Sequence, residues 1–208
     1  IRRQRQMCIR DRNALYFSSP ETFLPDAGNY KDSSADQLLT IFEKQSVQLL
    51  KLAGFNENES KKYAANAIKF DKLLAKYKKS QEELNDIAGI YNPYSISDFK
   101  AAFTNMNIDQ LLNGLLPNSP EKVIITEPKF LQHINELLSP DKFEELKSWL
   151  VVTFINHYAT YLSQEFREAA FAYDHAVYGA KELQSQAQHA YGIANNILGE
   201  VIGLYSVS

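Results

Sequence analysis

The stretch SPDKFEELKSWLVVTFINHYATYL, residues 139–162, decides the fold class. Ser139 and Pro140 are typical of a helix start, and the acidic residues after them suit a first turn, where the helix dipole favours anions. We expect this helix to reach about Leu162, with one apolar stripe made of Phe143, Leu146, Leu150, Phe154 and His157. A second apolar side is made of Trp149, Val152 and Ile155. A helix that is apolar on most of its circumference is central in its fold.

Helical periodicity continues on both sides of this stretch. A helix is predicted to begin after Ser34 and end at Gly54, and a second covers residues 57–78. Shorter helices are expected at 96–104 and 108–115, and another that Ser80 and Glu83 begin as a capping box. Ser163 is expected either to restart or to kink the central helix into residues 164–179, which Gly179 closes, and a last helix is expected at about 185–205. The expected fold class is therefore mainly α.

One or two short β-strands are expected beside the helices. Residues 15–17 and the β-branched run at 123–126 favour extended backbone. Pro128 follows the second run and suits the first turn of a helix. The segment YNPYS, residues 91–95, is typical of a turn, because Pro93 restricts the residue before it and Ser95 can cap the next helix.

Charge is distributed unevenly along the chain. Residues 1–12, IRRQRQMCIRDR, hold five of the six arginines, and Arg167 is the sixth. Residues 13–208 therefore contain 17 basic and 24 acidic residues. An acidic body of this kind does not indicate phosphate or nucleic-acid binding. The abrupt change in composition predicts that residues 1–12 are a foreign, adapter-derived or disordered head.

A row of lysines follows one side of the helix predicted at 57–78. We interpret it as a solvated face, and a docking or nucleic-acid patch is the alternative. The row consists of Lys62, Lys69, Lys72, Lys76 and Lys79.

The cysteine count and the hydropathy of the chain exclude several classes of protein. Cys8 is the only cysteine, so the body has no disulfide framework and no thiolate metal site. A reducing compartment fits this, as does bacterial secretion without disulfides. The longest apolar run, residues 149–155, is too short to span a membrane.

No catalytic motif is present in the sequence. H-E-x-x-H, G-x-S-x-G, G-x-G-x-x-G and P-loop patterns are all absent. His133 and Glu136 are spaced as a half-site for a metal, although a surface pair is the simpler interpretation. His157 is expected to be a satisfied core histidine, and Arg167 is a candidate for a buried ion pair. The sequence thus assigns no catalytic residue and no metal ligand to this chain, and its substrate-binding residues stay unknown.

Several segments, in order, resemble the neprilysin-type zinc metallopeptidases, and especially their bacterial endopeptidase O or oligoendopeptidase members. Together they cover nearly all of residues 13–205. These segments are FSSPETFLPDAGNY (17–30), YNPYSISDF (91–99), KVIITEPKFL (122–131), ELKSWLVVTFIN (145–156), LSQEFREAAFAY (162–173) and GEVIGLY (199–205).

The resemblance implies that residues 13–205 are part of the N-terminal helical lid domain of such an enzyme. A lid of this family encloses the catalytic cavity and limits substrates to oligopeptides. Zinc and its ligands would lie in a C-terminal catalytic domain, against which this chain would pack. The chain alone would then be inactive. Residues 206–208 depart from the family pattern and are expected to be a truncation edge. A bacterial cytoplasmic location, without a membrane segment or nucleic acid as partner, is expected.

Two alternatives stay open at this point. One is a stand-alone helical protein-interaction module, which uses the lysine face or the tyrosine-rich surfaces. The other is nucleic-acid binding through the arginines of residues 1–12.

Overall fold

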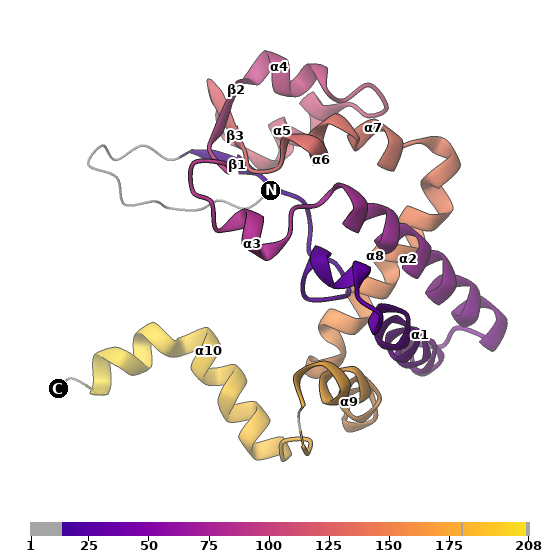
Figure 1. Ribbon diagram of the computed structural model, residues 1–208. Helices are drawn as coiled ribbons and strands as arrows, with labels where there is room; N and C mark the ends of the chain where they lie inside the picture. The colour runs from indigo at the N-terminus through magenta and orange to yellow at the C-terminus, as the bar shows by residue number, and fades with distance from the viewer. Residues whose placement is uncertain (1–13, 180, 207–208) are drawn as a thin grey trace.

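The fold is built from helices around one small sheet, as Figure 1 shows. The computed structural model describes residues 14–179 and 181–206. The longer helices are α1 (Ala35–Leu52), α2 (Glu57–Tyr77), α8 (Phe143–Tyr158), α9 (Gln164–Tyr178) and α10 (Gln186–Ser206). The shorter ones are α3 (Gln81–Leu84), α4 (Ile96–Ala101), α5 (Ile108–Leu115), α6 (Pro128–Gln132) and α7 (Ile134–Leu137), with 3₁₀ turns η1 (Ala27–Lys31), η2 (Pro140–Lys142) and η3 (Ala159–Tyr161). The predicted mainly α fold class is confirmed.

The ends of several helices lie where the sequence predicts them. The Ser80 hydroxyl accepts from the backbone N–H of Glu83, whose carboxylate accepts from the N–H of Ser80. This is the predicted capping box of α3. Pro128 occupies the first turn of α6. Gly54 and Gly179 have φ angles of 97° and 67° after α1 and α9, in the left-handed region that favours glycine.

The sheet has three strands in the order β1-β3-β2. Strand β1 (Leu15–Phe17) is parallel to β3 (Lys122–Ile125), and β2 (Asn92–Ser95) is antiparallel to it. The sequence predicts β1 and β3, but the prediction of a turn at 91–95 is wrong, because residues 92–95 form β2. Pro93 lacks an N–H, and an edge strand tolerates this since only one side of it is paired.

The long helices form a packed layer beside the sheet. In Figure 1 the sheet and α4–α7 lie at one end of the molecule, and α1, α2 and α8 lie at the other. Helix α2 packs along α8 and against α1, while α1 packs against α9. Helix α10 projects away from this body.

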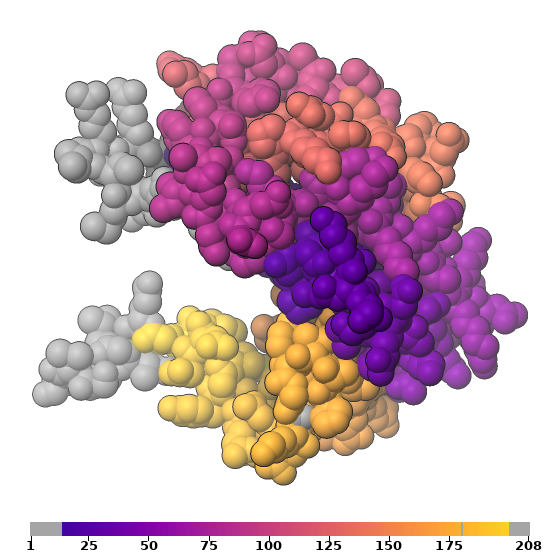
Figure 2. Space-filling view, viewed as in Figure 1, coloured from indigo at the N-terminus to yellow at the C-terminus, as the bar shows by residue number. Residues whose placement is uncertain are grey.

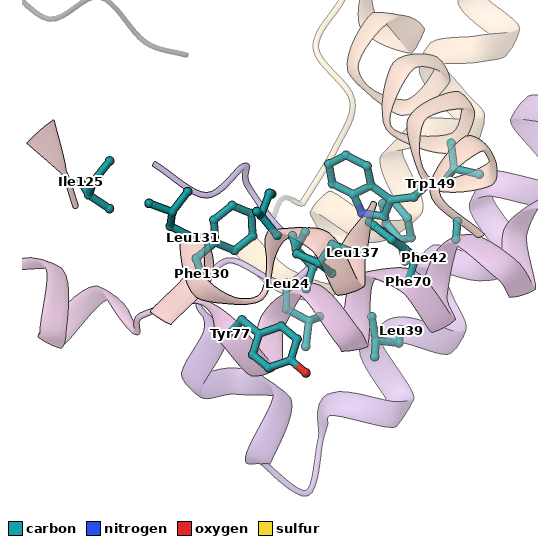
Figure 3. Close-up of a cluster of buried hydrophobic side chains, with 14 of the residues drawn as sticks. Leu24, Leu39, Phe42, Phe70, Tyr77, Ile125, Phe130, Leu131, Leu137 and Trp149 are labelled. Carbon is teal, nitrogen blue, oxygen red and sulfur yellow. The ribbon is translucent and has the colours of Figure 1, made fainter. Parts of the chain in front are cut away.

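The core is continuous from the sheet to the helical layer. Trp149 of α8 packs near Phe70 of α2, with ring centroids 6.0 Å apart, and Phe23 stacks on Phe42 of α1 at 4.2 Å. Figure 3 shows Trp149, Phe42 and Phe70 gathered at one end and Ile125, Phe130 and Leu131 near the sheet. Burial of these large side chains drives the assembly.

The buried face of α8 differs from the predicted stripe. Phe143, Leu150 and Phe154 are exposed, while Trp149 and Val152 are buried against the core. His157 is also exposed, so its expected place in the core is wrong. Because α8 is apolar on most of its circumference, periodicity alone does not select the side that α2 covers.

The prediction for Arg167 also needs correction. Its side chain is buried, but it donates to two neutral oxygens, Oε1 of Gln164 at 2.9 Å and the carbonyl of Gln184 at 2.7 Å. These bonds tie the start of α9 to the segment that precedes α10. Arg167 therefore serves as a hydrogen-bonded brace in place of the expected ion pair.

Candidate functional site

Asp71 of α2 is a buried carboxylate that holds three parts of the chain together. Its Oδ1 accepts from the indole N–H of Trp149 at 2.9 Å and from the N–H of Phe23 at 3.1 Å. Its Oδ2 accepts from the hydroxyl of Tyr30. The side chain is fully enclosed. Asp71 thereby joins α2, α8 and the segment before α1.

The environment of Asp71 favours its neutral form. Burial raises the pKa of this carboxyl to about 6, although hydrogen bonds from Tyr30, Trp149 and Phe23 act against that rise. Burial also raises the pKa of Tyr30 well above its usual range, and the Asp71 charge adds to this effect. The Tyr30 hydroxyl therefore keeps its proton and stays a donor to Asp71, which suits a structural role better than a catalytic one.

A second buried carboxylate, Glu127, holds the Ser18–Ala27 segment at its other end. Oε2 accepts from the N–H of Ser19 at 2.8 Å, and Oε1 accepts from the N–H of Lys79 at 2.7 Å. Glu127 lies two residues after the last residue of β3, so the bonds fix the Ser18–Ala27 segment to the sheet and to the end of α2. Two backbone donors that lie outside regular structure are satisfied in this way.

Tyr173 of α9 fixes the same segment from a third direction. Its hydroxyl donates to the carbonyl oxygen of Phe23, and its N–H donates to Oε1 of Gln45 in α1 at 2.8 Å. Burial raises the pKa of the Tyr173 hydroxyl, so it stays a donor. The Ser18–Ala27 segment is thus held by α2, α9 and the end of β3.

A polar cavity of about 490 Å³ lies along the Ser18–Ala27 segment. Figure 2 shows that this face of the molecule is hollowed between the magenta residues around α3 and the yellow residues of α10. Of the two elements that border the hollow, α3 supplies lining residues and α10 supplies none. The lining consists of Ser18, Ser19, Glu21, Thr22, Phe23, Pro25, Asp26, Ala27, Lys78, Lys79, Gln81, Leu84, Thr126, Glu127 and Tyr178.

The polar groups of the cavity are mostly engaged within the protein. The ammonium of Lys78 donates to the carbonyl of Pro20, and that of Lys79 donates to the carbonyl of Gly89, both at 2.8 Å. Asp26 accepts from the N–H of Gln81 at 3.1 Å. The cavity therefore has fixed walls, because the protein itself holds the charged side chains that line it.

The histidines lie apart from this cavity. Nδ1 of His133 lies 2.9 Å from the carbonyl oxygen of Lys129, and its ring stacks on Tyr77 at 4.0 Å. Glu136 instead accepts from the Tyr77 hydroxyl at 2.7 Å. His133 and Glu136 thus both contact Tyr77, and the structure gives no support to a half-site there.

Metal-ligating side chains do not converge in the part of the chain that the structure describes. There, no group of three or more His, Cys, Asp or Glu side chains could hold a metal ion. A zinc site needs three or four such ligands around one point. Residues 14–179 and 181–206 therefore do not fit a zinc ion.

The sequence analysis misses Asp71 and Glu127. Asp71 lies among lysines, yet it is four residues after Ala67 and three before Leu74, both on the predicted buried stripe of α2. That spacing is a signal for burial. Glu127 carries a weaker signal, because it stands between a predicted strand and a helix-initiating proline.

Comparison with known proteins identifies the family. The sequence profile of peptidase family M13 matches residues 7–208. The chain belongs to peptidase family M13. The neutral endopeptidase of Lactobacillus helveticus is 46% identical over 195 residues, which cover 94% of this chain and 30% of that protein. The predicted resemblance to neprilysin-type zinc metallopeptidases, through their N-terminal part, is confirmed.

Two solved structures share the fold. PepO from Lactobacillus rhamnosis HN001 matches with a TM-score of 0.84 and 33% identity, over 93% of this chain and 31% of that one. The Mycobacterium tuberculosis zinc metalloprotease Zmp1, solved in complex with an inhibitor, matches with a TM-score of 0.85 and 18% identity, over 94% and 30%. At that identity Zmp1 is a likeness of fold alone. The chain spans about a third of the length of these M13 relatives.

The M13 match does not test the expectations about a membrane segment or about the two ends of the chain. In the described part of the molecule, no helix is both long enough and apolar enough to cross a membrane. Residues 1–12, expected to be a foreign head, lie outside the described residues, as do residues 207–208 of the expected edge at 206–208. The division of the chain at 12 and 205 stays a prediction.

Proposed function

We propose that this M13 chain is the helical part of a zinc-dependent endopeptidase that cleaves oligopeptides, and that it forms one wall of the cavity where peptides are cut. The polar cavity along Ser18–Ala27, on the hollowed face of Figure 2, carries this proposal. Its sequence relatives include a neutral endopeptidase and a putative zinc metalloproteinase. Zinc and the catalytic groups belong to the rest of that longer enzyme, which we call the parent.

The way the wall is built supports a role in excluding large substrates. Asp71, Glu127 and Tyr173 fix the Ser18–Ala27 segment from three directions. A wall must keep its shape to exclude water and folded proteins, and buried hydrogen bonds provide that rigidity. We propose that the parent therefore accepts short, flexible peptides.

The stand-alone interaction module is less favoured. The family match accounts for the chain without it. The lysine face of α2 is also partly neutralised, because Lys69 pairs with Glu145 at 2.5 Å and Lys72 pairs with Asp36 at 2.8 Å. Ion pairs of this kind are typical of a solvated helix face.

Tyr178 offers a direct test of the cavity. It lines the cavity and is mostly exposed, so Tyr178→Ala should leave folding intact. In the parent enzyme this variant should change KM for an oligopeptide more than kcat, since the side chain lies on the wall and not at the zinc. Tyr91→Ala is the matched control, because Tyr91 is similarly exposed and does not line the cavity. Equal KM values for Tyr178→Ala, Tyr91→Ala and the parent would refute the proposal that this cavity is part of the substrate-binding wall.

The activity of the parent needs its own test. The gene should continue beyond codon 208 into an H-E-x-x-H motif, and the parent should cleave an oligopeptide but spare the same sequence inside a folded protein. A zinc chelator should abolish cleavage. We also propose the bacterial cytoplasm as the compartment, which cell fractionation checks.

A further inference from the structure

An apolar row, interrupted by the exposed Lys147, lies on the side of α8 that faces away from the core. Phe143, Leu150 and Phe154 are 59%, 55% and 63% exposed, whereas Trp149 on the opposite side is 6% exposed. Tyr158 and Tyr161 extend the surface beyond the helix, with Tyr158 4.5 Å from Phe154 and 6.2 Å from Tyr161 between ring centroids. We call these five residues the α8 outer stripe. Large apolar surfaces of this kind mark interaction sites.

A groove runs beside the stripe, between α8 and the end of α1. It has a volume of about 390 Å³. Leu150 and Phe154 belong both to the groove and to the α8 outer stripe. The lining is formed by Leu50, Ala53, Phe55, Leu150, Val151, Phe154 and Ile155, all of them apolar.

The spacing of the stripe fits a helix as its occupant. Its members are separated by seven, four, four and three residues, which keeps them in one row along a helix. Helix α8 has 16 residues and is thus about 24 Å long. An amphipathic helix of similar length can pack its apolar row along α8 and set side chains into the groove.

We propose that the α8 outer stripe and its groove seat an amphipathic helix from the portion of the parent that follows residue 208. The inference rests on the proposed function, because it takes the chain as part of a longer M13 enzyme. The lengths of the relatives support this occupant: the L. rhamnosis PepO match covers 93% of this chain but only 31% of PepO. The same fold therefore occurs beside a much longer stretch of polypeptide, and the stripe is not used by the core described above.

Thiol labelling of the full-length parent tests directly whether the α8 outer stripe and its groove are covered. In a Cys8→Ser background, the variant Phe154→Cys should react quickly with a thiol reagent in the 208-residue chain. In the parent its labelling rate should fall more than about tenfold, because a covered thiol reacts only after local opening. Ile87→Cys is the matched control, since Ile87 is 76% exposed and lies far from the stripe in sequence. It should label in both proteins.

Three other outcomes contradict the proposal. Equal labelling of Phe154→Cys in the chain and the parent would show an uncovered stripe. Protection of Phe154→Cys that depends on the concentration of the 208-residue chain would show that a second copy covers the α8 outer stripe. A parent without any polypeptide after residue 208 could not supply the proposed helix. A parent without zinc-dependent cleavage, in which Phe154→Cys is still protected from labelling, would refute the proposed function. The proposal that the α8 outer stripe binds a helix would stand.

Discussion

The indole N–H of Trp149 donates to Oδ1 of Asp71 at 2.9 Å, across 78 positions of sequence. This bond joins the two helices that pack most extensively, α2 and α8, through a carboxylate with no exposure. The Phe23 N–H and the Tyr30 hydroxyl share the same carboxylate. The wall of the proposed cavity thus depends on a group buried in the core.

Asp71 should give the stability of the chain a distinct pH dependence. Its folded pKa of about 6 lies above that of the unfolded chain, so the folded state binds the proton more tightly. The stabilisation from protonation is complete below about pH 4 and is lost as the pH rises through 6. The difference in unfolding free energy between the chain and Asp71→Asn should therefore change by about 3 kcal/mol from pH 4 to pH 7. Urea unfolding at several pH values measures it, and parallel curves for the two proteins would contradict the assignment.

Tyr30→Phe should destabilise the chain and strengthen that pH dependence. The variant removes the donor to Asp71 and the acceptor for the N–H of Leu24. We expect a loss of about 1–3 kcal/mol at pH 7. Because the Tyr30 bond holds the Asp71 pKa down, the pKa should rise further in the variant. Thermal unfolding at pH 5 and pH 7 checks both effects, and a smaller loss at pH 7 than at pH 5 would count against them.

Glu127→Ala should loosen the Ser18–Ala27 segment. Two partly buried backbone donors, the N–H groups of Ser19 and Lys79, would lose their partner. We expect a cost of about 2–4 kcal/mol and faster proteolysis within residues 18–27. Mass spectrometry of a timed digest locates the cuts. Glu121→Ala, at an exposed position, is the control and should leave the digest unchanged.

Two phenylalanines should differ sharply when truncated in the 208-residue chain. Phe70→Ala removes a core ring that packs near Trp149 and should cost about 3–5 kcal/mol. Phe154→Ala removes a ring of the α8 outer stripe and should change stability by less than about 0.5 kcal/mol. The fluorescence of Trp149, the only tryptophan, reports unfolding for both. Similar costs at the two positions would place Phe154 in the core.

Local sequence signals predict much of this fold because they act within a few residues. Ser80 and Glu83 cap α3 by contacts between neighbours, and Gly54 ends α1 through its own backbone freedom. The side of α8 that is buried depends on α2, whose contact with it joins residues far apart in sequence. Leu150 and Trp149 are both large and apolar, so only that tertiary contact decides which of them is covered.

The candidate cavity could not be predicted from the sequence, because the residues that hold its wall lie far apart along the chain. Asp71 looks like one more charge on a lysine-rich helix, and its partners Phe23 and Trp149 lie 48 and 78 positions away. Residues 91–95 carry turn-forming residues, yet pairing with β3 makes most of them a strand. Family resemblance provides the enzyme class, while the polar network emerges only from the three-dimensional arrangement.

The parallel pairing of β1 with β3 places Leu15 opposite Val123. During synthesis from the N-terminus, β1 leaves the ribosome long before its partner exists, and α1 and α2 are complete in the meantime. The sheet can close only after more than about 100 further residues have been added, which at typical rates of synthesis takes several seconds. Until then the backbone donors and acceptors of β1 stay available to other chains, so co-translational folding of this part depends on protection of its first strand.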